Sequence, residues 1–227
     1  MTTRDLDGWT IAFDLDGTLV ETASDLMGTL NRLLATRGLP PAPLESARTL
    51  IGRGVVPLLK RGFEAAGEPW DEAASPALVE AFLADYRIHI ADHSAAYPGA
   101  VEALDRLATR GAILCLATNK PTELAIALFD AIGLSSRFGS LCGPQSVSAR
   151  KPDGAHIREA VLQAGGDPAR AVMVGDSITD LDAARATGVP CILTTFGYTE
   201  TPAAELGADA LIDHFDELEA AIDALIH

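Results

Sequence analysis

Short apolar runs alternate with amphipathic stretches along most of this sequence. The apolar runs are rich in Ile, Val, Leu and Ala, and they predict β-strands at about 10–14, 112–117, 138–142, 171–175, 190–194 and 209–212. Continuous apolar runs of this kind are typical of strands buried on both faces of a sheet. Between them, helical spacing of apolar residues predicts helices at 99–110, 121–132, 153–165, 178–187 and 215–226. This alternation predicts an α/β fold with a doubly wound parallel sheet.

One long segment breaks the alternation of strand and helix. Residues 21–96 carry helical patterns, including amphipathic stretches at 54–66 and 75–92, and no convincing strand. A chain that leaves a sheet after its first strand and returns to it later carries an inserted unit. We therefore predict that 1–20 and 97–227 form a Rossmann-like catalytic core. The segment 21–96 would form a small helical cap domain over the ends of the strands.

Four polar clusters lie after predicted strands. They are DLDGT at 14–18, Thr118-Asn119-Lys120, Lys151-Pro152 and GDSITD at 175–180. Parallel α/β sheets bind ligands outside the carboxyl ends of their strands, where the strand order reverses. The four clusters therefore predict a single site at that edge of the sheet.

The first cluster places the carboxylates of Asp14 and Asp16 one residue apart, directly after an apolar strand. Two such groups at a dry strand end are unfavourable unless a cation neutralises them. Asp14 and Asp176 offer the oxygen ligands that suit Mg²⁺, and Lys151 and the Thr118 hydroxyl can hold phosphate oxygens. A cation and fixed donors around a phosphoryl group predict phosphoryl-transfer chemistry.

Acidic residues outnumber basic ones, with 32 Asp and Glu against 17 Lys and Arg and a formal net charge of −15. Such a charge repels nucleic acid and anionic membranes, so neither is expected as a partner. No apolar run reaches the roughly 18 residues that span a bilayer, and the first residues lack the pattern of a signal peptide. We expect a cytoplasmic monomer or homodimer that acts on a small phosphorylated metabolite.

Lysine is scarce in the chain, which gives the position of each one weight. It occurs only at Lys60, Lys120 and Lys151. We interpret Lys151 as a phosphate-binding residue. Lys120 stands at the start of a predicted helix, and we interpret it as a solvated charge.

The four clusters, in this order and at strand ends, resemble the motifs of the haloacid dehalogenase superfamily of phosphohydrolases. The resemblance covers nearly the whole chain, including the helical insertion between the first two motifs. It implies that Asp14 is a nucleophile forming an aspartyl-phosphate and that Asp16 is the general acid and base. It also implies a Mg²⁺ site made by Asp14, Asp16 through its backbone carbonyl, Asp176 and Asp180. Asp16 argues for phosphate esters, because members that cleave carbon–halogen or carbon–phosphorus bonds lack this second aspartate.

Within this superfamily, the insertion and the last motif are most similar to those of phosphoglycolate phosphatases. The resemblance implies that Thr118, Asn119 and Lys151 bind the phosphoryl group. Gly52 and Gly54 flank Arg53, which either pairs with a second anionic group of the substrate or is a solvated loop residue. The implied reaction is hydrolysis of 2-phosphoglycolate to glycolate and phosphate.

Three other functions stay open at this point. The first is hydrolysis of another small phosphate, such as a sugar phosphate, nucleotide or pyrophosphate. The second is the reaction of a mutase similar to β-phosphoglucomutase. A third alternative is a ligand-binding protein that has lost turnover, although every catalytic position of the motifs is present.

Overall fold

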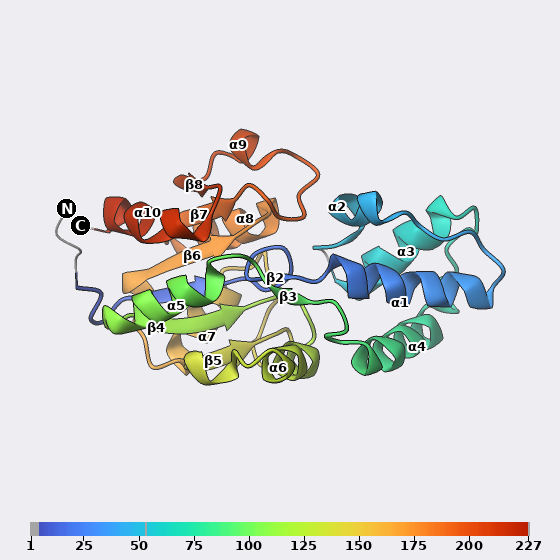
Figure 1. Ribbon diagram of the computed structural model, residues 1–227, viewed down its shortest axis with the longest axis horizontal. Helices are drawn as coiled ribbons and strands as arrows, with labels where there is room; N and C mark the ends of the chain where they lie inside the picture. The colour runs from blue at the N-terminus through green and yellow to red at the C-terminus, as the bar shows by residue number, and fades with distance from the viewer. Residues whose placement is uncertain (1–4, 53, 227) are drawn as a thin grey trace.

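The computed structural model describes residues 5–52 and 54–226, so Arg53 lies outside the described residues. Its centre is a parallel sheet with the strand order β5-β4-β1-β6-β7-β8 (Figure 1). The strands are β1 (Thr10–Phe13), β4 (Ile113–Ala117), β5 (Ser140–Cys142), β6 (Ala171–Gly175), β7 (Cys191–Thr194) and β8 (Ala210–Ile212). All the strands predicted from the apolar runs are confirmed, and the predicted fold class is correct.

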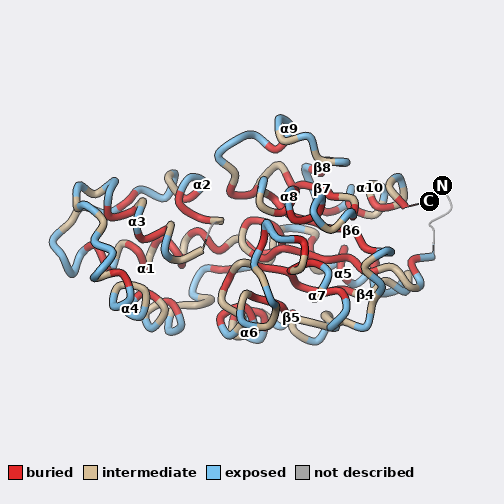
Figure 2. Tube along the Cα trace, turned by 180° about the vertical axis from the view of Figure 1, so that it is seen from behind, coloured by how far each residue is buried: buried red, intermediate tan, exposed pale blue. Residues whose placement is uncertain are grey.

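Helices cover both faces of this sheet. One face packs against α5 (Ala100–Thr109), α6 (Thr122–Ala131) and α10 (Leu218–Leu225), and the other against α7 (Ala155–Gln163) and α8 (Ile178–Thr187). Alternate residues of one strand serve the two faces: Ile11 and Phe13 belong to the first cluster, whereas Ala12 belongs to the second. In the described part of the chain, the connections also contain the short helix α9 (Ala203–Leu206) and 3-10 turns at Leu44–Ser46, Ser135–Arg137, Pro168–Arg170 and Phe215–Glu217. Figure 2 shows the buried positions concentrated along the strands and the inner sides of the helices.

The strand order reverses beside β1. The chain runs from β1 to β4 and β5 on one side, and then crosses to β6, which pairs with the opposite edge of β1. The carboxyl ends of β1, β4 and β6 therefore lie side by side at the switch point, where open α/β sheets bind ligands.

A second group of helices lies beyond those strand ends (Figure 1). It consists of α1 (Ala23–Thr36), α2 (Ala47–Leu50), α3 (Val55–Ala65) and α4 (Ser75–Ile88), and we call it the helical unit. It has a hydrophobic cluster of its own, which includes Leu30, Phe63 and Phe82. A Cβ at Gly62 would lie 2.7 Å from the Leu30 side chain, so the glycine lets α3 approach α1 closely. The division into a core and a cap domain at 20/21 and 96/97 stays a prediction.

Two short strands that the sequence did not predict join the sheet to the helical unit. β2 (Val20–Glu21) pairs antiparallel with β3 (Ala95–Ala96). Two-residue strands are too short to show a period, so the apolar pattern could not reveal them. Nearby, the Asp25 carboxylate accepts hydrogen bonds from the backbone N–H groups of His93 and Ser94. The helix predicted to reach residue 92 ends earlier, at Ile88.

Among the described residues, no helix has the length and apolar character needed to cross a bilayer.

Candidate active site

Three carboxylates meet at the carboxyl ends of β1 and β6. Asp14 follows β1, Asp176 follows β6, and Asp180 stands in the first turn of α8; an oxygen of each lies within 4.8 Å of the others. Burial is the largest influence on both strand-end groups. It raises the pKa of Asp14 to about 6 and raises the pKa of Asp176 well above its usual value. A cluster of hard oxygen donors that burial disfavours as bare anions fits a divalent cation such as Mg²⁺.

Asp180 has two separate tasks in this cluster. Its Oδ2 accepts hydrogen bonds from the backbone N–H groups of Asp176 (3.2 Å) and Ser177 (3.1 Å), and from the Ser177 hydroxyl. Ser177 is the N-cap of α8, so these bonds complete the start of the helix. Oδ1 of Asp180 lies 2.6 Å from Nζ of Lys151. One oxygen thus shapes the loop and the other contributes charge to the site.

Lys151 is buried among these acids. Its Nζ lies 2.8 Å from Asp14 Oδ1, and only 3% of the residue is exposed. Burial alone would lower the pKa of this ammonium, but the charges of Asp14 and Asp180 outweigh burial and raise it. Lys151 therefore stays protonated next to Asp14, as a fixed cation in a place with little water.

Asn119 holds the backbone of Lys151. Its Nδ2 donates to the carbonyl of Lys151 (2.9 Å), and its Oδ1 accepts from the N–H of Lys151 (3.0 Å). The backbone N–H groups of Leu15, Asp16 and Asn119 have no hydrogen-bond partner within the described part of the chain. Free backbone donors beside a lysine are the kind of groups that bind phosphate oxygens.

Thr118 lies at the end of β4, facing the same site. Its backbone N–H donates to the carbonyl of Cys142 (3.0 Å), which continues the ladder between β4 and β5 past the last strand residue. Its Oγ1 accepts a hydrogen bond from the backbone N–H of Lys120 (3.2 Å), so the hydroxyl proton can be donated to a ligand. Only 1% of Thr118 is exposed.

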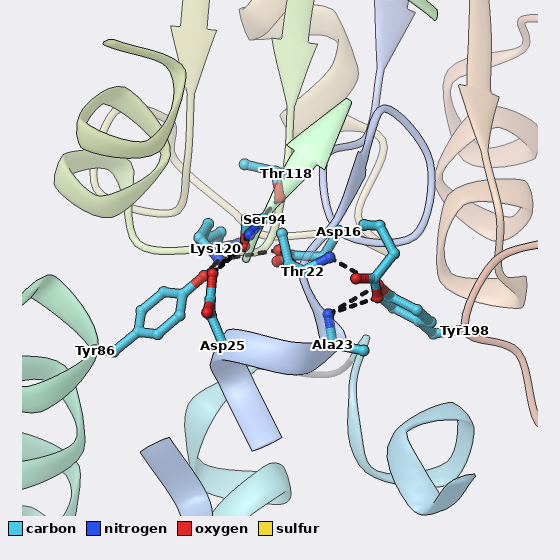
Figure 3. A network of polar contacts seen from close by, with 10 residues as sticks. Asp16, Thr22, Ala23, Asp25, Tyr86, Ser94, Thr118, Lys120 and Tyr198 are labelled. Atoms are coloured by element: carbon cyan, nitrogen blue, oxygen red, sulfur yellow. Dashed lines mark hydrogen bonds and ion pairs between the residues drawn. The ribbon is translucent and has the colours of Figure 1, made fainter. Parts of the chain in front are cut away.

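The interpretation of Lys120 as a solvated charge is wrong. The residue is 5% exposed, and its Nζ lies 2.9 Å from Asp16 Oδ1 and 2.8 Å from the hydroxyl of Tyr86. Figure 3 shows Lys120 lying between these two side chains. The same ammonium lies 4.5 Å from the centre of the Tyr86 ring. Tyr86 belongs to α4 of the helical unit, so that unit contributes to the burial of Lys120. Asp16 Oδ1 also accepts a hydrogen bond from the Thr22 hydroxyl (2.7 Å).

Tyr198 is a second residue that the sequence did not single out. Its backbone N–H donates to Asp176 Oδ2. Its hydroxyl accepts hydrogen bonds from the N–H groups of Thr22 (2.8 Å) and Ala23 (3.0 Å), and donates to Glu21 (2.7 Å), with the first two visible in Figure 3. No local motif surrounds Tyr198, and the contacts form only because the loop after β7 reaches the start of the helical unit.

A single pocket extends from this acidic cluster to the helical unit. Asp14, Asp16, Thr118, Lys120 and Lys151 line its polar floor. Its opposite wall is mostly apolar and contains Leu26, Val55, Leu58 and Phe82. Gly52 and Gly54 also line the pocket, whereas the role predicted for Arg53 falls outside the described residues.

Comparison with known proteins places this geometry in context. Residues 10–188 match the model of the haloacid dehalogenase-like hydrolase family. The chain is 51% identical to a phosphoglycolate phosphatase of Caulobacter vibrioides over 99% of this chain and 95% of the relative. It is 42% identical to one of Agrobacterium fabrum, over 98% of this chain and 95% of that relative.

Two solved structures also match this chain over nearly its whole length. The crystal structure of a predicted phosphoglycolate phosphatase from Haemophilus somnus matches with a TM-score of 0.85 and 30% identity, covering 96% of this chain and 97% of that one. CbbY from Rhodobacter sphaeroides, solved in complex with phosphate, matches with a TM-score of 0.74 and 27% identity over 94% of this chain and 98% of its own.

Proposed function

The chain belongs to the haloacid dehalogenase-like hydrolase family, and on this premise we propose that it hydrolyses 2-phosphoglycolate to glycolate and inorganic phosphate. The observation that carries the proposal is the 51% identity, over nearly the whole chain, to a relative named phosphoglycolate phosphatase. The grouping of Asp14, Asp16, Thr118 and Lys151 around one pocket supports it. So does the phosphate bound by the structurally similar CbbY.

In the first step of the proposed reaction, an oxygen of the Asp14 carboxylate attacks phosphorus. The bond between phosphorus and the ester oxygen breaks, and Asp14 becomes an aspartyl-phosphate. Lys151, 2.8 Å from Asp14, offsets negative charge on the phosphoryl oxygens, and the Thr118 hydroxyl and the free N–H groups orient them.

Mg²⁺ held by Asp14, Asp176 and the Asp16 carbonyl would supply further positive charge against those oxygens. Asp180 would support this site through Lys151 and the loop of Asp176.

Asp16 moves the protons in this scheme. Its protonated carboxyl gives a proton to the glycolate oxygen as the ester bond breaks, and the resulting carboxylate then takes a proton from the water that attacks the aspartyl-phosphate. Phosphate leaves, and Asp14 is regenerated. Lys120 and Thr22 both contact Oδ1 of Asp16, whereas Oδ2 has no hydrogen-bond partner among the described residues. We assign the proton transfer to Oδ2.

Release of inorganic phosphate from a panel of esters tests the proposal. The panel contains 2-phosphoglycolate, a sugar phosphate, a nucleotide and pyrophosphate, each measured with Mg²⁺ and with excess chelator. We expect the highest kcat/KM for 2-phosphoglycolate and no turnover without metal. A faster rate with another ester would remove the substrate assignment, and conversion of a sugar phosphate to an isomer without phosphate release would indicate a mutase. Full activity with chelator would remove Mg²⁺ from the scheme.

A further inference from the structure

Two buried lysines, Lys120 and Lys151, line different parts of the polar floor of the pocket. Lys151 lies against Asp14, where the proposed reaction places phosphorus. Lys120 lies against Asp16, where the same reaction places the ester oxygen of the leaving group. The two ammonium groups therefore face different parts of a bound phosphate ester. Lys151 faces the phosphoryl group that all substrates share, and Lys120 faces the part that distinguishes one substrate from another.

Lys120 has a hydrogen-bond donor to spare. An ammonium group carries three N–H donors. Asp16 and Tyr86 accept from two of them, and no other described residue accepts from the third. Because Lys120 also lines the pocket, this donor is available to a ligand. The neighbouring wall is formed by side chains such as Leu58 and Phe82, which offer no competing polar group.

We propose that Lys120 binds the carboxylate of the substrate's leaving group and is thereby a specificity-determining residue for acidic phosphate esters. This inference rests on the proposed function. In 2-phosphoglycolate a single methylene separates the ester oxygen from the carboxylate carbon. Lys120 Nζ lies 2.9 Å from the carboxylate of Asp16, the group that would protonate the ester oxygen. A carboxylate that close to the ester oxygen falls within reach of the same ammonium.

The setting makes such a contact selective. A charge-assisted hydrogen bond in a place with little water is stronger than one between neutral groups. A neutral leaving group would offer this donor either no acceptor, which leaves it unpaired and buried, or an uncharged acceptor such as an amide carbonyl, which binds it more weakly. The Tyr86 hydroxyl accepts from Lys120 and can donate its own proton to the same carboxylate. Since Tyr86 stands on α4, the subsite is made jointly by the sheet and the helical unit.

The test compares two nearly isosteric esters, 2-phosphoglycolate and the phosphate ester of glycolamide, in wild type and Lys120→Met. Wild type should prefer the acid by roughly 10- to 100-fold in kcat/KM, as expected for a hydrogen bond between charged groups. Lys120→Met should abolish most of that preference, chiefly through a higher KM for the acid, because the contact exists before and during reaction. Lys60→Met is the matched control. The Lys60 side chain is 46% exposed and lies outside the pocket lining, so both rates should stay unchanged.

Several outcomes would overturn the inference. Equal losses for both esters in Lys120→Met, mainly in kcat, would mean that Lys120 only orients Asp16. Equal kcat/KM values for the two esters in wild type would also exclude a carboxylate subsite, and this measurement does not depend on the folding of any variant. In that case the proposed phosphatase activity stands. If wild type hydrolyses no phosphate ester in the presence of Mg²⁺, the proposed function itself fails.

Discussion

Tyr198 donates its backbone N–H to Oδ2 of Asp176 at 2.5 Å, across 22 positions of sequence. The same residue reaches the start of the helical unit through its hydroxyl, which accepts from the N–H groups of Thr22 and Ala23. Tyr198 thus contacts both the acidic cluster and the segment at Thr22 and Ala23, where the chain passes from the sheet to the helical unit. The two contacts use different groups of Tyr198, so a substitution can separate them.

Tyr198→Phe should remove the contact with the helical unit and keep the contact with Asp176. The buried N–H of Thr22 then loses its acceptor, which should lower the free energy of unfolding by about 1–3 kcal/mol. The Mg²⁺ concentration that gives half-maximal activity should stay unchanged, because the backbone N–H remains. Urea unfolding and a Mg²⁺ titration measure the two quantities. A variant as stable as wild type would show that the hydroxyl contributes nothing to the connection.

Because Gly197 has no side chain, the side chain of Asp176 can lie directly against its backbone. A Cβ at this position would lie 2.2 Å from the Cβ of Asp176 and 2.4 Å from its Oδ2, distances that force the carboxylate to move. Gly197→Ala should therefore weaken activation by Mg²⁺ by roughly 10- to 100-fold, the usual effect of disturbing groups that orient a metal ligand.

Gly28→Ala is the control for that prediction. Gly28 lies inside α1, and its added Cβ would meet only the end of the flexible Arg32 side chain at 3.3 Å. Alanine favours a helix over glycine, so the variant should be as stable as wild type or more stable, by up to about 1 kcal/mol. Its Mg²⁺ activation should be normal. Equal activation of both variants by Mg²⁺ would contradict the importance of the space beside Asp176.

Asp14→Asn should remove turnover without unfolding the protein. The substitution keeps the shape of the side chain and removes the proposed nucleophile, so kcat should fall more than about 10³-fold. Burial disfavours the ionised form of Asp14, since its pKa is raised to about 6, and the neutral amide should therefore be tolerated. Asp182→Asn is the control, because that side chain is half exposed on α8 and its activity should equal wild type. Substantial turnover by Asp14→Asn would point to another nucleophile.

The sequence predicted the acidic cluster because its signals are local. Asp14 directly follows an apolar strand, and Asp176 and Asp180 occupy the turn between a strand and a helix, so topology alone brings them to one edge of the sheet. The same turn starts the next helix, since Ser177 is the N-cap of α8 and serine is a residue type that favours this position. A pattern of a few neighbouring residues is enough to predict which side chains follow a strand and which start a helix.

The burial of Lys120 could not be predicted from such local patterns. At the start of a helix a lysine is usually solvated, and nothing within several residues of Lys120 indicates otherwise. Its burial depends on Tyr86, 34 positions earlier, and on the way α4 lies over the strand ends. A contact between segments so far apart is decided by tertiary packing. The same reason explains why Tyr198 was not predicted.

His156 should make the stability of the protein depend on pH in the weakly acidic range. The residue is fully buried in α7, and its Nε2 lies 3.3 Å from the carbonyl of Cys142. Burial, with a smaller contribution from the charge of Lys151, lowers its pKa from 6.5 to about 4. The unfolded chain therefore binds a proton more readily than the folded one between these pH values. The contribution of His156 to stability is complete above pH 6.5 and is lost as pH falls toward 4.

A pKa difference of this size corresponds to a loss of roughly 3 kcal/mol in the free energy of unfolding over that range. His156→Gln keeps a hydrogen-bond donor for the Cys142 carbonyl but cannot titrate, so its stability should change much less between pH 7 and pH 4.5. His93→Gln is the control, because His93 is exposed and should leave the pH dependence as in wild type. Urea unfolding of the three proteins at several pH values measures the difference. The same decline in wild type and His156→Gln would assign the pH dependence to other groups.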